Sequence, residues 1–527
     1  MSKVISRQEA AKLVQDDMTL AMLGFVTLSV PEDLLVSLEE RFLAEGHPKN
    51  LNLFYTSAIG DGKEHGANRL AHEGMIRRIV GAHVGLAPKL NSLIVNNKLE
   101  SFCAPQGVLV HLCRAMAGHK CGVITHVGLK TFCDPDVEAC CFNDAARLAT
   151  EQGRGIVKAI EIDGRRLLHY KVDAPDVCFI KATYGDSRGN LSMDQEGVLL
   201  EQQEMAMATK ANGGIVIAQV NELVADNSLD PRIVKVHGHF VDYVVVGRPE
   251  YSRQHYFDDK AYHPEWTGDV RMPTGSIKPM EYGLRKIIAR RAAMELRKGC
   301  LVNLGFGMPD GVASVAGEEG VSKEMTLSIE SGTLGGVPAP GNGCGASAGV
   351  EAIIKHSEIF DAYDGGCIDI AYLGAAQIDR HGNVNVSSFS GRMTGPGGFI
   401  NITQNAKKIC FLGTFSGTKD VDIRLEDGKI NIVKDSNVIK YVADVDQITF
   451  SGEYAKETGQ EVLYITERAV FKITEQGLTL VEIAPGIDLE KDIFPLMAFK
   501  PAVAADLKLM DARIFSPEKM GLEVPAK

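Results

Sequence analysis

The stretch that decides the fold is DVCFIKATYGDSRGNLSM, residues 176–193, because it recurs later in the chain as DIAYLGAAQIDRHGNVNV, residues 369–386. The two copies align without a gap, and five identical pairs share one constant offset: Asp176/Asp369, Ala182/Ala375, Asp186/Asp379, Gly189/Gly382 and Asn190/Asn383. Each copy reads as an apolar strand, a turn of the form D-x-x-G-N and a second short apolar strand. An internal repeat of this kind predicts two related domains.

The similarity extends to both sides of the repeat. Downstream, GGIVIAQV (213–220) matches KKICFLGTF (407–415) as a further buried strand that follows a polar, helical segment. Upstream, LGFVTLSVPEDLLVSL from Leu23 resembles LGFGMPDGVASVA from Leu304, each a strand, a Gly-Phe loop and a proline that opens a helix. Strands that alternate with helices predict an α/β protein with largely parallel sheets. We therefore expect a tandem of two related open α/β domains.

The segment between the two domains has a different composition. Residues 247–283 concentrate Pro, Tyr, His and the only tryptophan, without helical or strand period, and are expected to form a linker. This places the first domain at residues 1–246 and the second at 284–527. The second domain begins with GLRKIIARRAAMELRKG (283–299), whose apolar positions recur at helical spacing and whose end is marked by Lys298-Gly299.

Composition limits the classes of function. The chain has 527 residues, 45% of them hydrophobic and 24% charged, and a formal net charge of −12, which argues against a nucleic-acid or anionic-membrane surface. The charged N-terminal segment lacks the core of a signal peptide and no apolar run is long enough to cross a bilayer, so we expect a cytoplasmic protein. The eleven cysteines contain no C-x-x-C pair. The pairs His111/Cys113 and His119/Cys121 lack zinc spacing, so no metal is expected.

A single carboxylate, Glu330, stands in a loop that is otherwise poor in side chains, in MTLSIESGTLGGVPAPG (325–341). It falls at the end of an expected strand, and the carboxyl ends of parallel strands are where α/β sheets bind ligands. Glycines after it permit close backbone approach by a bulky substrate. The loops NLGFGMPDG (303–311) and GPGGFINI (395–402) could add amides that stabilise an oxyanion.

The sequence lacks two common phosphate-binding motifs. The chain has no G-x-x-x-x-G-K-[ST], and the G-x-G-x-x-A at 341–346 follows two prolines where the dinucleotide fingerprint needs a strand. A carboxylate nucleophile beside an oxyanion pocket suits acyl transfer, in which two carboxylates exchange a thioester without ATP.

Four motifs in order resemble the family I coenzyme A transferases: APQG (104–107), NLGFGMP (303–309), ESGTLGGVPAPG (330–341) and GPGGFINI (395–402). The chain is most similar to the fused acetate or short-chain acyl-CoA transferases and the propionate CoA-transferases, over about residues 5 to 515. The resemblance implies two coenzyme A transferase domains, the first like an α subunit and the second like a β subunit.

The resemblance also implies roles for individual residues. Glu330 would be the nucleophile that becomes a glutamyl-CoA thioester in a ping-pong reaction. The amide of Met308 and an amide of Gly397 or Gly398 would form the oxyanion hole. Gln106 would approach Glu330 and hydrogen-bond it or the acyl group.

Further implications concern coenzyme A. Gly305 and Gly307 would pass close to its pantetheine or thioester, and Lys407 or Lys408 would lie near its phosphates. Coenzyme A is then a substrate, with no permanently bound cofactor, and the protein is expected to be a homotetramer. One departure is Cys140-Cys141, where relatives tend to have Gly-Gly, which leaves the conformation of that loop open.

Three functions remain open from the sequence: a CoA-transferase, a thioesterase on the same scaffold, and a catalytically silent acyl-CoA sensor. The first two could both use Glu330. Short unbranched acids are preferred by resemblance, with acetate, propionate, butyrate, lactate and acetoacetate as candidate substrates.

Overall fold

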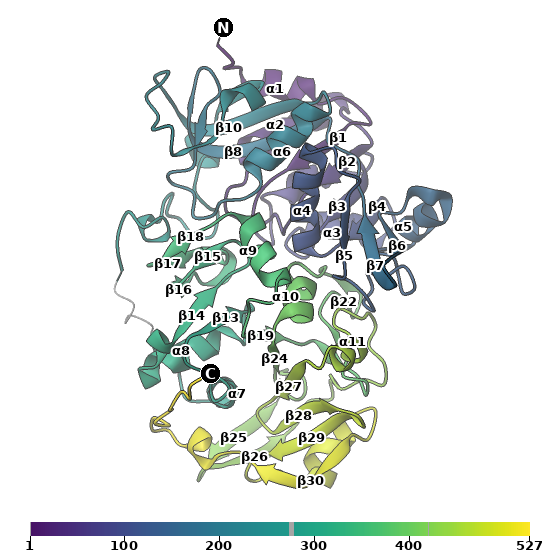
Figure 1. Cartoon of the computed structure of the whole chain (residues 1–527), viewed down its shortest axis with the longest axis vertical. Coiled ribbons are helices and arrows are strands. Elements are labelled where there is room, and N and C mark those ends of the chain that lie inside the picture. Colours follow the sequence, from purple (N-terminus) through teal and green to yellow (C-terminus); the bar gives the residue numbers. More distant parts are fainter. Residues whose placement is uncertain (1, 273–278, 420) are drawn as a thin grey trace. The chain divides into compact units, whose positions relative to one another are not determined.

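The computed structural model describes residues 2–272, 279–419 and 421–527, which form two compact units. Unit 1 comprises Met1–Met272, Ile329–Asp361 and Gly391–Asn401, and unit 2 comprises Pro273–Ser328, Ala362–Ser390 and Ile402–Lys527 (Figure 1). Each unit is built around a largely parallel sheet with helices packed against it. The expected α/β class is confirmed.

The units differ from the two halves expected from the sequence. Two segments of the second half, 329–361 and 391–401, belong to unit 1. The predicted domains, 1–246 and 284–527 with the linker between them, therefore stay a prediction, because the division into compact units is a different division of the chain. Residues 273–278 of the expected linker lie outside the described residues.

The main sheet of unit 1 has parallel strands in the order β12-β10-β8-β1-β2-β3-β4. Their bounds are β1 (Thr19–Met22), β2 (Leu51–Phe54), β3 (Ile76–Gly81), β4 (Glu100–Cys103), β8 (Val177–Asp186), β10 (Ile215–Val224) and β12 (Tyr243–Val246). The short strands β9 (Leu191–Ser192) and β11 (Val234–Val236) join it in antiparallel fashion. Central strands such as β8 are buried along almost their whole length, as expected of a parallel sheet that is covered on both faces.

Helices and smaller sheets surround this sheet. The helices are α1 (Arg7–Leu13), α2 (Glu32–Glu45), α3 (Pro88–Val95), α4 (Gln106–Ala117), α5 (Asp144–Ala149) and α6 (Gln202–Ala211), with α9 (His356–Asp364) and α10 (Phe399–Asn405) beginning in unit 1. A small antiparallel sheet of β5 (Val123–Thr125), β7 (Arg165–Tyr170) and β6 (Val157–Ile162) lies beyond β4 (Figure 1). Two short pairs, β15 (Thr333–Leu334) with β18 (Ala352–Ile353) and β16 (Val337–Pro338) with β17 (Ser347–Ala348), shape the loop after Glu330.

Unit 2 repeats the plan and extends it. Its parallel strands are β14 (Met325–Ser328), β13 (Cys300–Leu304), β19 (Ile370–Gly374), β24 (Lys408–Leu412) and β27 (Glu461–Ile465), followed by β28 (Ala469–Thr474), β29 (Gly477–Ile483) and β30 (Ala502–Leu509). Its helices include α7 (Leu284–Ala293), α8 (Asp310–Glu319) and α11 (Gly452–Glu457). The hairpins β20 (Gln377–Ile378) with β21 (Val384–Asn385) and β25 (Asp422–Glu426) with β26 (Lys429–Lys434) also belong to unit 2, and a further short pair joins β22 (Ser388–Phe389) to β23 (Arg392–Met393).

The repeated turn D-x-x-G-N has the same hydrogen bonds in both units. In unit 1, Asp186 accepts from the backbone N–H of Asn190 (2.9 Å) and from its side-chain amide (2.8 Å). In unit 2, Asp379 accepts from the backbone N–H of Asn383 (3.0 Å) and from its amide (2.9 Å). The glycine of each turn has a positive φ, +88° and +79°, which explains the residue type.

The aspartate at the start of each repeat also accepts an equivalent hydrogen bond in the two units. Asp176 accepts from the backbone N–H of Thr19 at the start of β1 (2.7 Å), and Asp369 accepts from that of Leu301 in β13 (2.8 Å). Each therefore ties its strand to the first strand of its own unit. The predicted internal repeat is confirmed down to individual hydrogen bonds.

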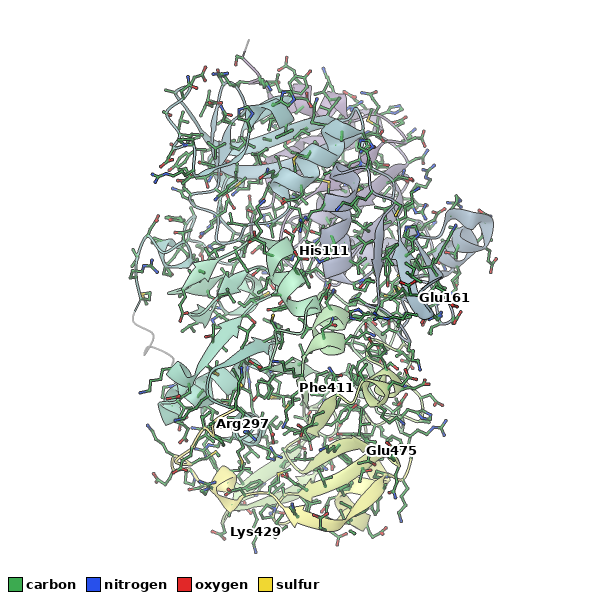
Figure 2. All side chains as sticks on the ribbon, viewed as in Figure 1. His111, Glu161, Arg297, Phe411, Lys429 and Glu475 are labelled. Atoms are coloured by element: carbon green, nitrogen blue, oxygen red, sulfur yellow. The ribbon has the colours of Figure 1, made fainter. Side chains whose placement is uncertain are left out.

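The helix predicted to end at Lys298-Gly299 ends earlier, at Ala293. Backbone carbonyls at and just beyond this end accept hydrogen bonds from side chains. The hydroxyl of Tyr372 donates to Ala292 O (3.2 Å), and the guanidinium of Arg297 (labelled in Figure 2) donates to the carbonyls of Met294 and Leu296. These partners replace the hydrogen bonds of a further turn.

Candidate active site

Glu330 occupies the second position of a tight turn over 329–332 in unit 1. The N–H of Gly332 donates to Ile329 O (3.0 Å), and the N–H of Ile329 donates to Thr333 O (3.0 Å). Gly332 has φ +102°, and a Cβ there would lie 2.1 Å from Ile354 O. Only glycine fits this position, so the turn presents Glu330 from a fixed backbone.

The same turn is fastened to the segment that carries His356. The N–H of Ile354 donates to Gly332 O (2.9 Å), and Thr333 of β15 pairs with Ile353 of β18. His356 follows at the first position of α9, with its own N–H donated to Leu199 O (2.8 Å). The backbone thus brings His356 close to Glu330.

Gln106 is the first residue of α4, directly beyond the carboxyl end of β4. Its backbone N–H donates to Gly397 O (3.0 Å), and the N–H of Gly107 donates to the side-chain oxygen of Asn401 (3.0 Å). A Cβ on Gly107 would lie 2.5 Å from the Asn401 amide nitrogen, which explains the glycine. The structure therefore brings together two predicted site segments, APQG and GPGGFINI.

The two glycines proposed as alternative oxyanion donors are not equivalent. The N–H of Gly397 is already donated to Ala82 O (2.9 Å). Gly398 is buried, precedes α10, and its N–H meets no acceptor within the described part of the chain.

A line of buried polar side chains ends at Gln106. The hydroxyl of Thr56 donates to Glu201 Oε2 (2.8 Å), Glu201 Oε1 lies 2.6 Å from His356 Nδ1, and His356 Nε2 lies 2.9 Å from Gln106 Nε2. Thr56, Glu201, His356 and Gln106 are 1%, 1%, 0% and 3% exposed. Sequence reasoning found Gln106 and missed the other three, because each is a single polar residue with no motif around it.

Burial raises the pKa of the Glu330 carboxyl above its ordinary value of 4.5, while a backbone hydrogen bond and the nearby His356 imidazole oppose that rise. A carboxylate that is poorly solvated is more reactive than one in water. The electrostatic environment of Glu330 therefore differs from that of a solvated turn residue.

The remaining predicted residues belong to unit 2. Gly305, Gly307 and Met308 follow β13 at its carboxyl end, where Gly307 has φ +92° and donates its N–H to Asp310 (3.1 Å). The Met308 carbonyl accepts from the N–H of Gly311 (3.2 Å), while its N–H has no acceptor among the residues described.

Lys407 lies at the other end of the same sheet. It precedes β24, and its Nζ is 2.9 Å from Asp369 Oδ1 at the amino edge of the parallel strands. The structure therefore does not bring Lys407 together with Gly305 and Gly307. Lys408 forms an ion pair with Glu295 at 2.5 Å and is also placed at that edge.

The histidines and cysteines considered as metal ligands have other partners. His111 (Figure 2) is on α4 with its Nε2 3.5 Å from Asp361 Oδ1, and the thiol of Cys113 donates to Leu109 O. In the Cys140-Cys141 pair, Cys140 has φ +64°, the left-handed region that favours glycine, and burial raises the pKa of its thiol.

A second histidine cluster lies in the expected linker. Among the described residues, His255, Asp258 and His263 bring one ligand atom each within 4.8 Å. However, burial lowers the pKa of His255 to about 4, and its Nδ1 accepts the N–H of Phe257 (3.0 Å). The single ring proton is therefore on Nε2, the nitrogen that faces Asp258, and this tautomer offers no lone pair on that side.

Comparison with known proteins identifies the class. The model of the family described as coenzyme A transferase matches residues 4–247 and 285–491, and the chain belongs to this family. The chain is 44% identical to a caffeate CoA-transferase of Acetobacterium woodii, in an alignment that covers 99% of each protein. It is 38% identical to the acetate CoA-transferase YdiF of Escherichia coli K12, in an alignment that covers 99% of this chain and 97% of that protein. The predicted family is confirmed.

The fold is likewise similar to a solved relative. The acyl-CoA transferase YdiF of E. coli O157:H7, in a thioester complex with CoA, superposes with a TM-score of 0.93 at 37% identity and covers 100% of this chain and 98% of that one. In the described residues, no helix has the length and apolar character needed to span a membrane.

Proposed function

We propose that the protein transfers coenzyme A between a short-chain acyl-CoA and a free carboxylic acid such as acetate, through a thioester on Glu330. The observation that carries this proposal is the partly buried carboxylate of Glu330, whose pKa is raised by desolvation and which is held by a glycine-dependent turn in the same unit as Gln106 and Gly398. Membership of the coenzyme A transferase family supports it.

The reaction proceeds by two exchanges at Glu330. A carboxylate oxygen of Glu330 attacks the thioester carbonyl, and the C–S bond breaks to give a mixed anhydride and CoA thiolate. The thiolate then attacks the Glu330 carbonyl carbon, which releases the first acid as a carboxylate and leaves CoA on the enzyme. The acceptor carboxylate repeats the two steps in reverse, so no ATP or water is consumed.

The choice between the two glycine amides rests on their hydrogen bonds in unit 1. Because the N–H of Gly397 is taken by Ala82, Gly398 is the better of the two oxyanion donors. For Gly305, Gly307 and Met308 we propose the roles that the family resemblance implies. Lys407 and Lys408 are left out because of their ion pairs at the amino edge.

Acceptor dependence separates this reaction from hydrolysis. With acetate present, propionyl-CoA should be consumed continuously and converted to acetyl-CoA, and without acetate its consumption should stop near one equivalent per site. Digestion after that single turnover should show CoA on the peptide containing Glu330, and hydroxylamine should convert it to a hydroxamate. Loss at equal rates without acetate would identify a thioesterase, and saturable CoA binding without turnover would identify a sensor.

The acids themselves need a direct assay. One relative is named for caffeate and another for acetate, so a panel of acceptors should include aromatic propenoic acids beside acetate, propionate, butyrate, lactate and acetoacetate. The highest kcat/KM for an unbranched short acid would support the proposed substrate class. Preference for the aromatic acid by more than about tenfold would reject it while leaving the transferase reaction intact.

A further inference from the structure

The line Thr56–Glu201–His356–Gln106 has a role that the chemistry of Glu330 does not itself explain. Its members come from four separate segments: after β2, before α6, the start of α9 and the start of α4. Gln106 and His356 are 250 residues apart in sequence. Burying an ionised carboxylate and an imidazole costs free energy unless both are paired, so their convergence needs a reason.

One hydrogen bond and one close ion-pair contact define the arrangement at the Glu201 end. Glu201 accepts from the Thr56 hydroxyl on one oxygen and faces His356 Nδ1 at 2.6 Å with the other. Because a carboxylate oxygen offers only lone pairs, a favourable contact at this distance requires the ring proton on Nδ1 of His356. The Glu201 carboxylate thereby fixes both the tautomer and the plane of the ring.

The other ring nitrogen then acts on Gln106. With its proton on Nδ1, His356 offers a lone pair at Nε2, which accepts an N–H from the Gln106 amide at 2.9 Å. The side-chain oxygen of Gln106 points away from the ring, toward Gly397. A Cβ placed on Gly397 would lie 3.7 Å from this oxygen. The neighbouring rings of Phe25 and Phe360 lie 5.7 and 5.2 Å from the imidazole and limit its rotation.

The geometry points to His356, oriented by Glu201, as a positioning residue that fixes which end of the Gln106 amide faces the reacting acyl group. This inference rests on the proposed CoA transfer through Glu330. An amide that is free to turn presents either a donor or an acceptor, and only one of the two matches a developing oxyanion or the Glu330 carboxylate. Glu201 and His356 act through Gln106 and need not touch the substrate.

The direct test replaces Glu201 by glutamine. Glu201→Gln keeps the shape and can still accept from His356 with its amide oxygen, so folding should survive, but it removes the charge that fixes the tautomer. We expect kcat to fall about 10- to 100-fold. The dissociation constant for acyl-CoA should stay within about twofold of the wild-type value, since the binding energy comes mainly from parts of CoA remote from the thioester.

Glu204→Gln is the matched control. Glu204 lies in the first turn of α6, three residues after Glu201, is 7% exposed and pairs at 2.9 Å with Lys355, which is next to His356 in sequence. Removing its charge changes the local field without touching the imidazole. Wild-type kcat is expected in this variant. An equal loss in both variants would show that net charge matters and would overturn the positioning role.

A double-mutant cycle with Gln106→Ala shows whether the effect passes through Gln106. If it does, adding Glu201→Gln to Gln106→Ala should cost less than twofold in kcat. A full 10- to 100-fold further loss, or an unchanged kcat in Glu201→Gln alone, would overturn the inference. Failure of the proposed function looks different, because the wild-type protein itself would then form no Glu330-CoA thioester.

Discussion

At the scale of single residues, the raised pKa of Glu330 has a consequence for stability. The folded state holds the Glu330 proton more tightly than the unfolded chain, whose pKa is near 4.5. Ionised Glu330 therefore destabilises the fold once the pH exceeds 4.5, and this penalty is absent at lower pH. Glu330→Gln should raise the melting temperature at pH 7 to 8, with a difference from wild type that vanishes below pH 4.5.

The matched control for this experiment is an exposed glutamate. Glu475 (Figure 2) lies in the turn between β28 and β29, with its side chain in solvent, so Glu475→Gln should change the melting temperature little at either pH. A Glu330→Gln variant that is less stable than wild type at pH 8 would mean that the carboxylate is well solvated or firmly paired, against the environment described here.

The Gly398 amide can be tested by removing its hydrogen. Gly398→Pro deletes the N–H, and proline is tolerated at the start of a helix such as α10. Gly398→Ala keeps the N–H and adds a side chain. If Gly398 is an oxyanion donor, the proline variant should lose about 10²–10³ in kcat relative to the alanine variant. Equal rates in the two folded variants would reassign the donor.

Glu330 could be found from sequence, and its helpers could not. The carboxylate stands out because glycines surround it and because the loop lies after an expected strand. His356, in IIKHSEIF, looks like any polar residue at a helix start, and Glu201 like any acid before a helix. Their meaning comes from one contact, 2.6 Å between Nδ1 and Oε1, which depends on how distant segments pack.

At the scale of elements, the central strand β8 carries a buried charge. Lys181 lies 2.6 Å from Glu196 Oε1, and the Ser29 hydroxyl donates to Glu196 Oε2 at 2.6 Å. Both charged side chains are at most 1% exposed. Lys181→Met would leave the Glu196 carboxylate buried without its counter-charge, and should lower the free energy of unfolding by about 3–5 kcal/mol.

Urea unfolding of three proteins checks this prediction. Adding Glu196→Gln to Lys181→Met removes the unpaired charge and should restore most of the lost stability. If the single variant is as stable as wild type, or if the double variant is no better than the single one, the ion pair does not stabilise β8 in the way described.

Elements themselves were predicted where a local pattern was sufficient. The paired D-x-x-G-N turns, the strands beside them and the helices after Pro31 and Pro309 all follow from local residue preferences. The end of α7 did not, because the side chain of Tyr372 donates to Ala292 O in its last turn and that of Arg297 donates to the carbonyls of Met294 and Leu296 just beyond it. The spacing of apolar residues along a helix cannot predict that side chains elsewhere will bind its terminal carbonyls.

At the scale of the whole molecule, the expected tetramer can be weighed against the surface of unit 2. Strand β30 is at the edge of its sheet and exposes Val503 and Leu509, by 40% and 67%. Exposed apolar residues on an edge strand favour coverage by another chain. Light scattering at micromolar concentration should give about four times 57.0 kDa. A species of 57.0 kDa alone would reject the tetramer.

The route of the chain between its units has a consequence for how the protein can be made. The polypeptide passes from one unit to the other five times, and Gln106 and Glu201 reach unit 1 from the first half of the gene while Glu330 and His356 reach it from the second. A break at residues 272/273 should therefore inactivate both fragments, and co-expression of 1–272 with 273–527 should restore turnover. If the mixed fragments bind each other yet remain inactive, continuity of the chain is required. If the mixed fragments are active, the main effect of joining the two halves covalently is that one messenger RNA yields equal amounts of both.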